Sequence, residues 1–221
     1  MTFAGFGEGA VEFYDGLEAD NSKAYWTDQR GVYDADVREP MQALLAALEP
    51  EFGRGKIFRP YRDVRFSADK TPYKTHCGAT AGPFYVQLGA DGLMAAGGYY
   101  QMASDQVARF RAAVDDDRRG LDLQRRLAAI ADAGAGDAVV AGGEMVVRGE
   151  MLKTRPRGVD PEHPRIDLLR HKSLFGSRTW PPDDTLHEAG SVDRVVAAWR
   201  ALTPLVEWLS DHVGPSDQPR R

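Results

Sequence analysis

The chain has 221 residues, of which 43% are hydrophobic and 28% are charged, a composition typical of soluble globular proteins. Its net charge of −5 and pI near 5.6 argue against a dedicated duplex-DNA binder, which usually has a broad basic face. A single cysteine, Cys77, excludes an intramolecular disulfide, and no run approaches the 18 apolar residues that a membrane span needs. We therefore expect a cytoplasmic protein without a signal peptide.

The N-terminal part predicts helices. Apolar residues at three-residue spacing indicate a helix over residues 8–18. Asn21 and Ser22 are good caps for a second helix that begins near Lys23. Because Pro40 interrupts the apolar pattern of this helix, we expect a kink or break just before it.

The middle of the chain predicts strands. Residues 57–65 have the pattern of a strand, and residues 67–72 that of a loop. Residues 84–88 and 93–100 flank an Asp-Gly turn, which is the strongest hairpin signal in the chain. Ser104 or Asp105 is expected to cap the helix that follows.

The C-terminal half alternates helices and short strands. The expected elements are a helix over 121–131, strands near 145–147 and 172–178, an extended loop over 153–164, and a closing helix from Ser191 that Pro204 bends. Helices beside a hairpin-rich sheet predict an α+β fold, with an antiparallel sheet packed against N-terminal, central and C-terminal helices. We expect a single domain over residues 1–213 and a disordered Pro-rich tail over 214–221.

The most distinctive stretch is basic and runs from Phe58 to His76. Between residues 59 and 74 it carries five Arg or Lys side chains against two Asp. Guanidinium groups together with Tyr, Ser and Thr hydroxyls are the donors that bind phosphate or carboxylate oxygens. The candidate ligand-binding residues here are Arg59, Tyr61, Arg62, Asp63, Arg65, Lys70, Tyr73 and Lys74.

Two further features extend this candidate site. His76 adjoins the stretch and is a weak candidate for a proton carrier. A second basic stretch, over residues 153–158, contributes Arg155 and Arg157, which we expect to close the pocket if the two stretches meet. The five histidines lack zinc spacing and no dinucleotide, Walker A or hydrolase motif is present, so the sequence predicts no metal and identifies no cofactor.

Three interpretations of the basic stretch stay open. The first is a pocket for a phosphorylated or carboxylated small molecule such as a nucleotide, with or without catalysis. The second is a nucleic-acid-associated module in which Tyr61, Phe66 and Tyr73 stack on bases. In the third, an interaction protein, the Arg, Asp and Lys side chains form a purely structural network.

The sequence also resembles a known family. The run from Arg59 to His76, with Arg59-x-Tyr61-Arg62-Asp63-x-Arg65-Phe66-Ser67 followed by Asp69-Lys70-Thr71-Pro72-Tyr73-Lys74, is similar to the signature of domain of unknown function 2461. Further similarity lies in Gly5-Phe6, Val37-Arg38-Glu39-Pro40, Gly97-Gly98, Arg155-Pro156-Arg157-Gly158, His163-Pro164 and Lys172-Ser173. The resemblance covers nearly the whole chain and implies one compact domain but no activity.

Overall fold

A computed structural model describes residues 2–65, 67–136 and 145–218. The chain divides into two compact units. The described part of the first unit is 2–65, 67–95 and 179–197, and that of the second is 96–136, 145–178 and 198–218.

The strands form a six-stranded antiparallel sheet in the order β1-β2-β3-β4-β6-β5. Their bounds are β1 Gly55–Ile57, β2 His76–Ala81, β3 Phe84–Gly89, β4 Gly92–Tyr99, β5 Val146–Arg148 and β6 Leu174–Trp180. The expected hairpin is confirmed as β3 and β4, and Gly92 after the two-residue turn has a φ of +95°, a conformation that favours glycine. With helices at the N-terminal, central and C-terminal positions, the α+β prediction is confirmed.

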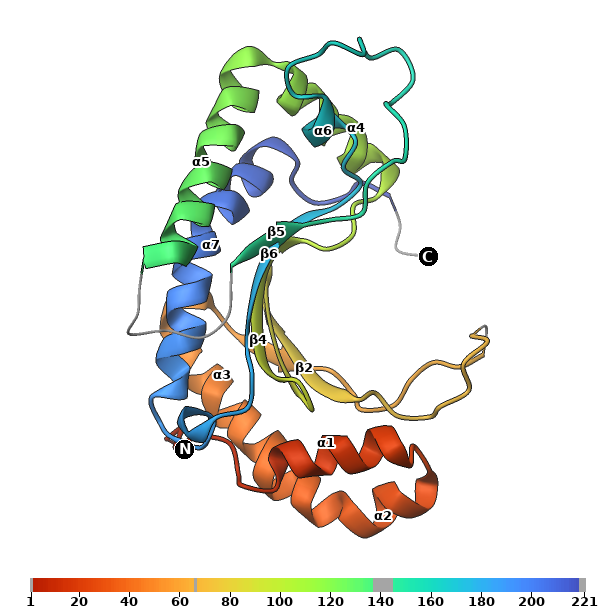
Figure 1. Ribbon diagram of the computed structural model, residues 1–221, viewed down its shortest axis with the longest axis vertical. Coiled ribbons are helices and arrows are strands. Elements are labelled where there is room, and N and C mark those ends of the chain that lie inside the picture. Colours follow the sequence, from red (N-terminus) through yellow and green to blue (C-terminus); the bar gives the residue numbers. More distant parts are fainter. Residues whose placement is uncertain (1, 66, 137–144, 219–221) are drawn as a thin grey trace. The chain divides into compact units, whose positions relative to one another are not determined.

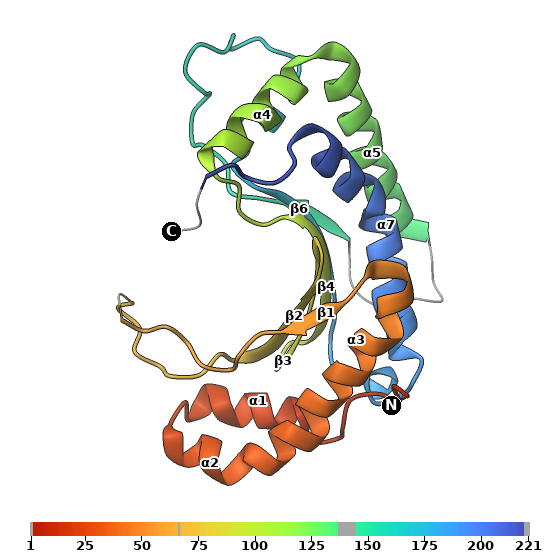
Figure 2. The ribbon, with the colours of Figure 1, turned by 180° about the vertical axis from the view of Figure 1, so that it is seen from behind.

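Two N-terminal helices, α1 and α3, pack against the first unit's strands, and a third, α2, packs against α1 (Figures 1 and 2). They are α1 Ala10–Ala19, α2 Lys23–Val32 and α3 Glu39–Phe52, with a π-helix, η1 Tyr33–Arg38, between α2 and α3. The Ser22 hydroxyl accepts from the Tyr25 N–H and so caps α2, as predicted.

The expected break before Pro40 is instead a π-helix. The Glu39 N–H donates to the Asp34 carbonyl, five residues back rather than four. Pro40 has no N–H, and the wider turns just before it let the helical backbone continue without the bond that an α-helix would need there. The helical face from Trp26 to Leu48 is therefore unbroken.

The strand predicted over residues 57–65 is wrong in its extent, because β1 ends at Ile57. Residues 58–65 and 67–75 instead form an arm that leaves the sheet between β1 and β2 (Figures 1 and 2). Its base is held by an isolated bridge between Tyr61 and Tyr73, by the Arg62 N–H donating to the Pro72 carbonyl (2.9 Å), and by the Lys74 N–H donating to the Pro60 carbonyl (2.8 Å). Beyond the bond from the Phe58 N–H to the Gly78 carbonyl of β2, the described part of the arm does not continue the β1–β2 ladder, so it is not a sheet strand.

Helices dominate the second unit. They are α4 Ser104–Asp115, α5 Asp117–Gly136, α6 Ile166–Leu169 and the greater part of α7 Ser191–His212. Phe110 of α4 meets Trp208 of α7 edge to face at 6.0 Å, and the Trp208 indole N–H donates to the Arg119 carbonyl. The predicted cap of α4 is wrong by one residue: Ala103 is the N-cap, and the Gln106 side chain accepts from its N–H at 3.0 Å.

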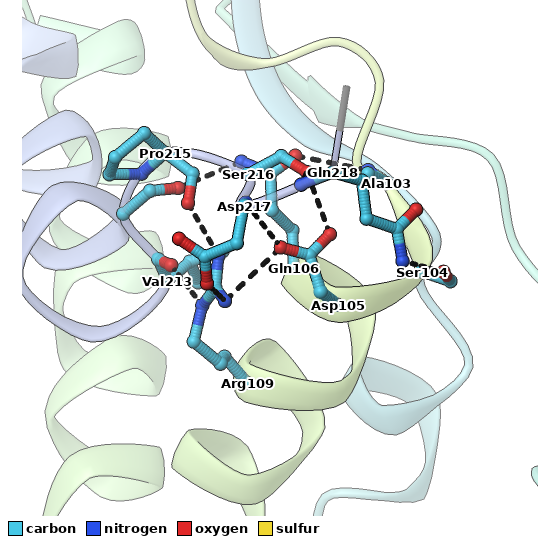
Figure 3. A network of polar contacts seen from close by, with 11 residues as sticks. Ala103, Ser104, Asp105, Gln106, Arg109, Val213, Pro215, Ser216, Asp217 and Gln218 are labelled. Atoms are coloured by element: carbon cyan, nitrogen blue, oxygen red, sulfur yellow. Dashed lines mark hydrogen bonds and ion pairs between the residues drawn. The ribbon is translucent and has the colours of Figure 1, made fainter. Parts of the chain in front are cut away.

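The segment after α7, Gly214–Gln218, lies against the first turns of α4 (Figure 3). Arg109 donates to the Val213 and Pro215 carbonyls, both at 2.6 Å, and pairs with Asp217 and Asp105. Gly214–Gln218 belong to the stretch 214–221 that was predicted to be a disordered tail. Residues 219–221 of that stretch lie outside the described residues.

Candidate functional site

A groove in the first unit lies between the α2–η1–α3 helices and the chain from β1 into the arm. Its volume is about 610 Å³, within the range of pockets that hold small molecules. Its charged and aromatic lining residues are Trp26, Arg30, Tyr33, Asp34, Arg38, Glu49, Arg54, Phe58, Arg59 and Tyr61. We call this the helix–arm groove.

Positive charge prevails in the lining of the groove, with four arginines against two acidic residues. Asp34 is shared between two of them: its carboxylate lies 3.4 Å from Arg30 and 3.8 Å from Arg38. Arg54 and Arg59 form no hydrogen bond or ion pair within the described ranges 2–65, 67–136 and 145–218. Guanidinium groups without protein acceptors are positioned to meet an anion that enters the groove.

The aromatic side of the groove is built as a stack. Trp26, which is buried, lies parallel to Tyr73 with ring centroids 4.5 Å apart and planes 8° apart. Tyr61 is the outer ring of this cluster, 6.1 Å from Trp26 and 5.5 Å from Tyr73, and is 49% exposed. An anchored ring with half of its surface open is a platform on which a ligand can pack.

Of the residues predicted from the basic stretch, Arg59 and Tyr61 line the groove. Arg62 is engaged inside the arm, where its Nη1 bonds the Asp69 carboxylate and the Thr71 hydroxyl. Lys70 likewise bonds the Val64 carbonyl, at 3.0 Å. These contacts agree with the structural interpretation of the network, at least for the tip of the arm.

Asp63 and Arg65 form an exposed two-bond pair within the arm. Arg65 Nε and Nη2 donate to the two Asp63 carboxylate oxygens at 2.9 and 2.7 Å. The bonds from Arg65 lower the pKa of Asp63 to about 2. The Thr71 backbone N–H, followed by Arg62, lowers the pKa of Asp69 to about 2 as well. Both carboxylates are therefore ionised hydrogen-bond acceptors at neutral pH, and their low pKa makes them weak general bases.

Tyr73, Lys74 and His76 do not line the groove. Tyr73 is buried in the stack, which removes it from the set of rings on which bases could stack. The Lys74 ammonium lies 5.2 Å from the centroid of the Phe58 ring. His76 lies on β2 next to Cys77, and alternation along the strand directs the two side chains to opposite faces, with Cys77 on the buried, helix-covered one.

The environment of His76 favours its neutral form. Burial, followed by the charge of Lys74, lowers the pKa of His76 below its ordinary value of 6.5. Cys77 on the other face is a poor nucleophile, because burial raises the pKa of its thiol to about 11 despite a hydrogen bond with Tyr33.

The second basic stretch belongs to the second unit. Arg155 Nη1 donates to the Val159 carbonyl at 2.6 Å, four residues further along the same loop, and Arg157 is exposed. A role for these two arginines in closing a pocket stays a prediction.

The sequence interpretation missed half of the groove. Arg30 and Arg38 stand four residues either side of Asp34 in a helical segment, a spacing that indicates a charged ladder on one face. The sequence did not indicate that Arg54 belongs to the site, because Arg54 follows the glycine that ends α3 and lies outside the basic stretch. Arg30, Arg38 and Arg54 line one groove because the arm leaves β1 beside α3, an arrangement that the local sequence does not indicate.

Within the described ranges, no three or more His, Cys, Asp or Glu side chains are grouped so that they could hold a metal ion. The helices in those ranges include none with the length and apolarity to cross a lipid bilayer.

A family model described as "Conserved hypothetical protein (DUF2461)" matches residues 9–208, which include the whole helix–arm groove. Searches of curated proteins and of solved structures found no match.

Proposed function

Because this chain belongs to the DUF2461 family of conserved hypothetical proteins, whose description names no activity, we propose a function from the groove itself: it binds a phosphorylated or carboxylated small molecule. The observation that carries this proposal is the pair Arg54 and Arg59, which line the groove without a hydrogen bond or ion pair to any described residue. An anion would satisfy both guanidinium groups, and Arg30 and Arg38 add charge that Asp34 offsets only in part.

The groove supports a binding site for a small molecule more than a nucleic-acid surface. The chain has a net charge of −5, and of the three rings named for base stacking Tyr73 is already stacked on Trp26. Phe66 lies outside the described residues. An extended single strand of nucleic acid needs several exposed aromatic rings along a basic track. The basic track that this groove offers is short.

A thermal-shift screen at low and moderate salt tests the proposal. The probes are inorganic phosphate, pyrophosphate, sugar phosphates, nucleotides, dicarboxylates and a short single-stranded oligonucleotide. A ligand that binds only the native state raises the melting temperature. We expect a small anion to do so, and the shift to shrink as salt rises.

The matched variants are Arg54→Ala/Arg59→Ala and, as a control, Arg118→Ala/Arg125→Ala on α5. Both pairs remove two exposed arginines, but only the first lines the groove. The groove pair should weaken binding by more than about tenfold, as expected for charge-assisted hydrogen bonds. Equal affinity in the two double variants, or stabilisation by the oligonucleotide alone, would reject the proposal.

A further inference from the structure

The groove presents a cation and an open ring from one short piece of chain. Arg59 and Tyr61 both line it and lie two residues apart in the chain, with a bend at Pro60 between them. A nucleoside phosphate likewise carries an anion and a planar base in one small molecule, joined through a single sugar. A simple sugar phosphate or a dicarboxylate has no ring to place against Tyr61.

The ring is held in place before any ligand arrives. The bridge from Tyr61 to Tyr73 fixes its backbone, and Tyr73 is in turn stacked on Trp26. Asn21 bonds both the N–H and the carbonyl of Tyr73, at 3.0 and 3.1 Å, and so ties the arm to the start of α2. A preorganised platform loses little conformational freedom on binding, which favours affinity.

A second open ring lies on the same wall. Phe58 lines the groove and is 39% exposed, and the Lys74 ammonium lies 5.2 Å from its centroid. Exposed aromatic surface that lines a groove, unlike a single exposed ring elsewhere, is typical of ligand-binding sites. Two open rings next to arginines provide both apolar contact and charge for one ligand.

From this arrangement we infer that the ligand of the helix–arm groove is an anion joined to a planar aromatic ring, of the nucleoside phosphate class, with its ring on Tyr61 and its phosphate at Arg59 and Arg54. The inference rests on the proposed function and makes it more specific. Tyr61 sets specificity, and the arginines supply the affinity that every anion shares.

Calorimetric titration of matched probes tests it. Adenosine 5′-phosphate and ribose 5-phosphate share the phosphate and the sugar, and only the first has a base. We expect the nucleotide to bind at least about tenfold more tightly, as base stacking on aromatic side chains typically gives. Guanosine and uridine 5′-phosphates should show the same preference, because every base has a π-face.

Three variants separate the ring from the charge. Tyr61→Phe should keep the preference for the nucleotide, Tyr61→Leu should abolish it by weakening the nucleotide far more than ribose 5-phosphate, and Arg54→Ala/Arg59→Ala should weaken both probes. Melting without ligand shows whether the Leu variant is folded. If the Leu variant is not folded, the ratio of nucleotide affinity to ribose 5-phosphate affinity in the wild type and in the Phe variant still tests the inference.

The outcomes distinguish the two proposals. If ribose 5-phosphate binds as tightly as the nucleotide, the aromatic inference is wrong and the anion groove stands. If neither these probes nor any other anion binds, both are wrong. If the nucleotide binds but Tyr61→Leu retains the full preference, the ring lies elsewhere and the inference is overturned.

Discussion

The ring of Tyr73 lies flat on the indole of Trp26, 4.5 Å away and inclined by 8°. This pair joins the base of the arm to α2, two parts of the chain almost fifty residues apart. It is the contact that gives the helix–arm groove two walls, because it holds the start of the arm, where Arg59 and Tyr61 lie, opposite the helices. The stability of the arm and the shape of the groove therefore depend on the same few residues.

We predict that Asn21→Ala loosens the base of the arm. Asn21 donates to the Tyr73 carbonyl and accepts from its N–H, so the change leaves two partly buried backbone groups without partners. The free energy of unfolding should fall by about 2 kcal/mol, as measured by urea denaturation. Lys23→Ala, an exposed change two residues away, is the control and should lie within about 0.5 kcal/mol of the wild type. Identical midpoints for both variants would show that the clamp contributes nothing.

The tip of the arm should lose order in acid. The pKa of Asp69 is lowered to about 2 by the bonds from Thr71 and Arg62, whereas in an unfolded chain it is close to 3.9. A pKa that folding lowers stabilises the folded form above the unfolded value, and this contribution disappears as the pH falls toward 2. The protection of the Thr71 amide against exchange, relative to its intrinsic exchange rate at each pH, should therefore fall between about pH 4 and 2, and in Asp69→Ala it should already be low at pH 6. A Thr71 amide equally protected in the variant would contradict the contact.

Burial and Lys74 make His76 a second pH probe. Its pKa lies below 6.5 in the folded chain, so the unfolded chain binds the proton more readily, and stability should decrease as the pH falls below about 6.5. Lys74→Met removes the smaller of the two causes. In NMR titrations the pKa of His76 should therefore rise in this variant yet stay below 6.5, because burial persists. A midpoint at or above 6.5 in the wild type would also remove the reason to regard His76 as neutral.

Gly98 belongs to the Gly97-Gly98 pair that contributes to the family resemblance, and its geometry requires glycine. Its φ is +125°, and a Cβ built on it would lie 2.7 Å from the Leu174 carbonyl oxygen. Gly53 is also at positive φ, +82°, but nothing lies within 4 Å of its would-be Cβ. Gly53→Ala should destabilise by about 1–3 kcal/mol through backbone strain alone, and Gly98→Ala by a further 1–3 kcal/mol, roughly, through the clash. Chemical denaturation of the two variants checks the order, and equal losses would mean that β6 yields to the added methyl group.

The fold class, the hairpin and most helices were predictable because they follow local patterns. Apolar spacing and the Asp-Gly turn are read directly from the sequence. The arm was not predictable from the sequence. Polar and aromatic side chains at alternate positions, Arg59, Tyr61, Asp63 and Arg65, favour a strand, but these residues have no partner strand in the sheet. Pro40 likewise indicates a break, and the π-helix that resolves it depends on packing along the whole α2–η1–α3 face.

The candidate site was predicted in part for the same reason. The charges of the basic stretch were evident, but which of them stay open depends on pairings such as Arg62 with Asp69, formed when the arm folds back on itself. Asn21 shows the limit most clearly: Asn21 and Ser22 were both predicted as caps of α2, and Ser22 does cap it, whereas Asn21 bonds the arm fifty-two residues away. The local sequence identifies the hydrogen-bond donors, but the acceptors that they bond depend on contacts between distant parts of the chain.

Arg109 should control the segment that follows α7. Its guanidinium donates to the Val213 and Pro215 carbonyls and pairs with Asp105 and Asp217, so a single side chain holds both ends of the turn in Figure 3.

We predict that Arg109→Ala releases Gly214–Gln218 and speeds proteolysis and amide exchange there by tenfold or more, while the unfolding free energy falls by only about 1–2 kcal/mol. Arg109→Lys keeps the charge but cannot fork between two carbonyls, so it should release the segment almost as fully. The control is Arg118→Ala on α5, an exposed arginine outside this network. Protection of the segment in the Lys variant would mean that charge alone secures it, and protection in the Ala variant would assign the hold to Asp105, which accepts from the Ser216 hydroxyl and the Asp217 N–H.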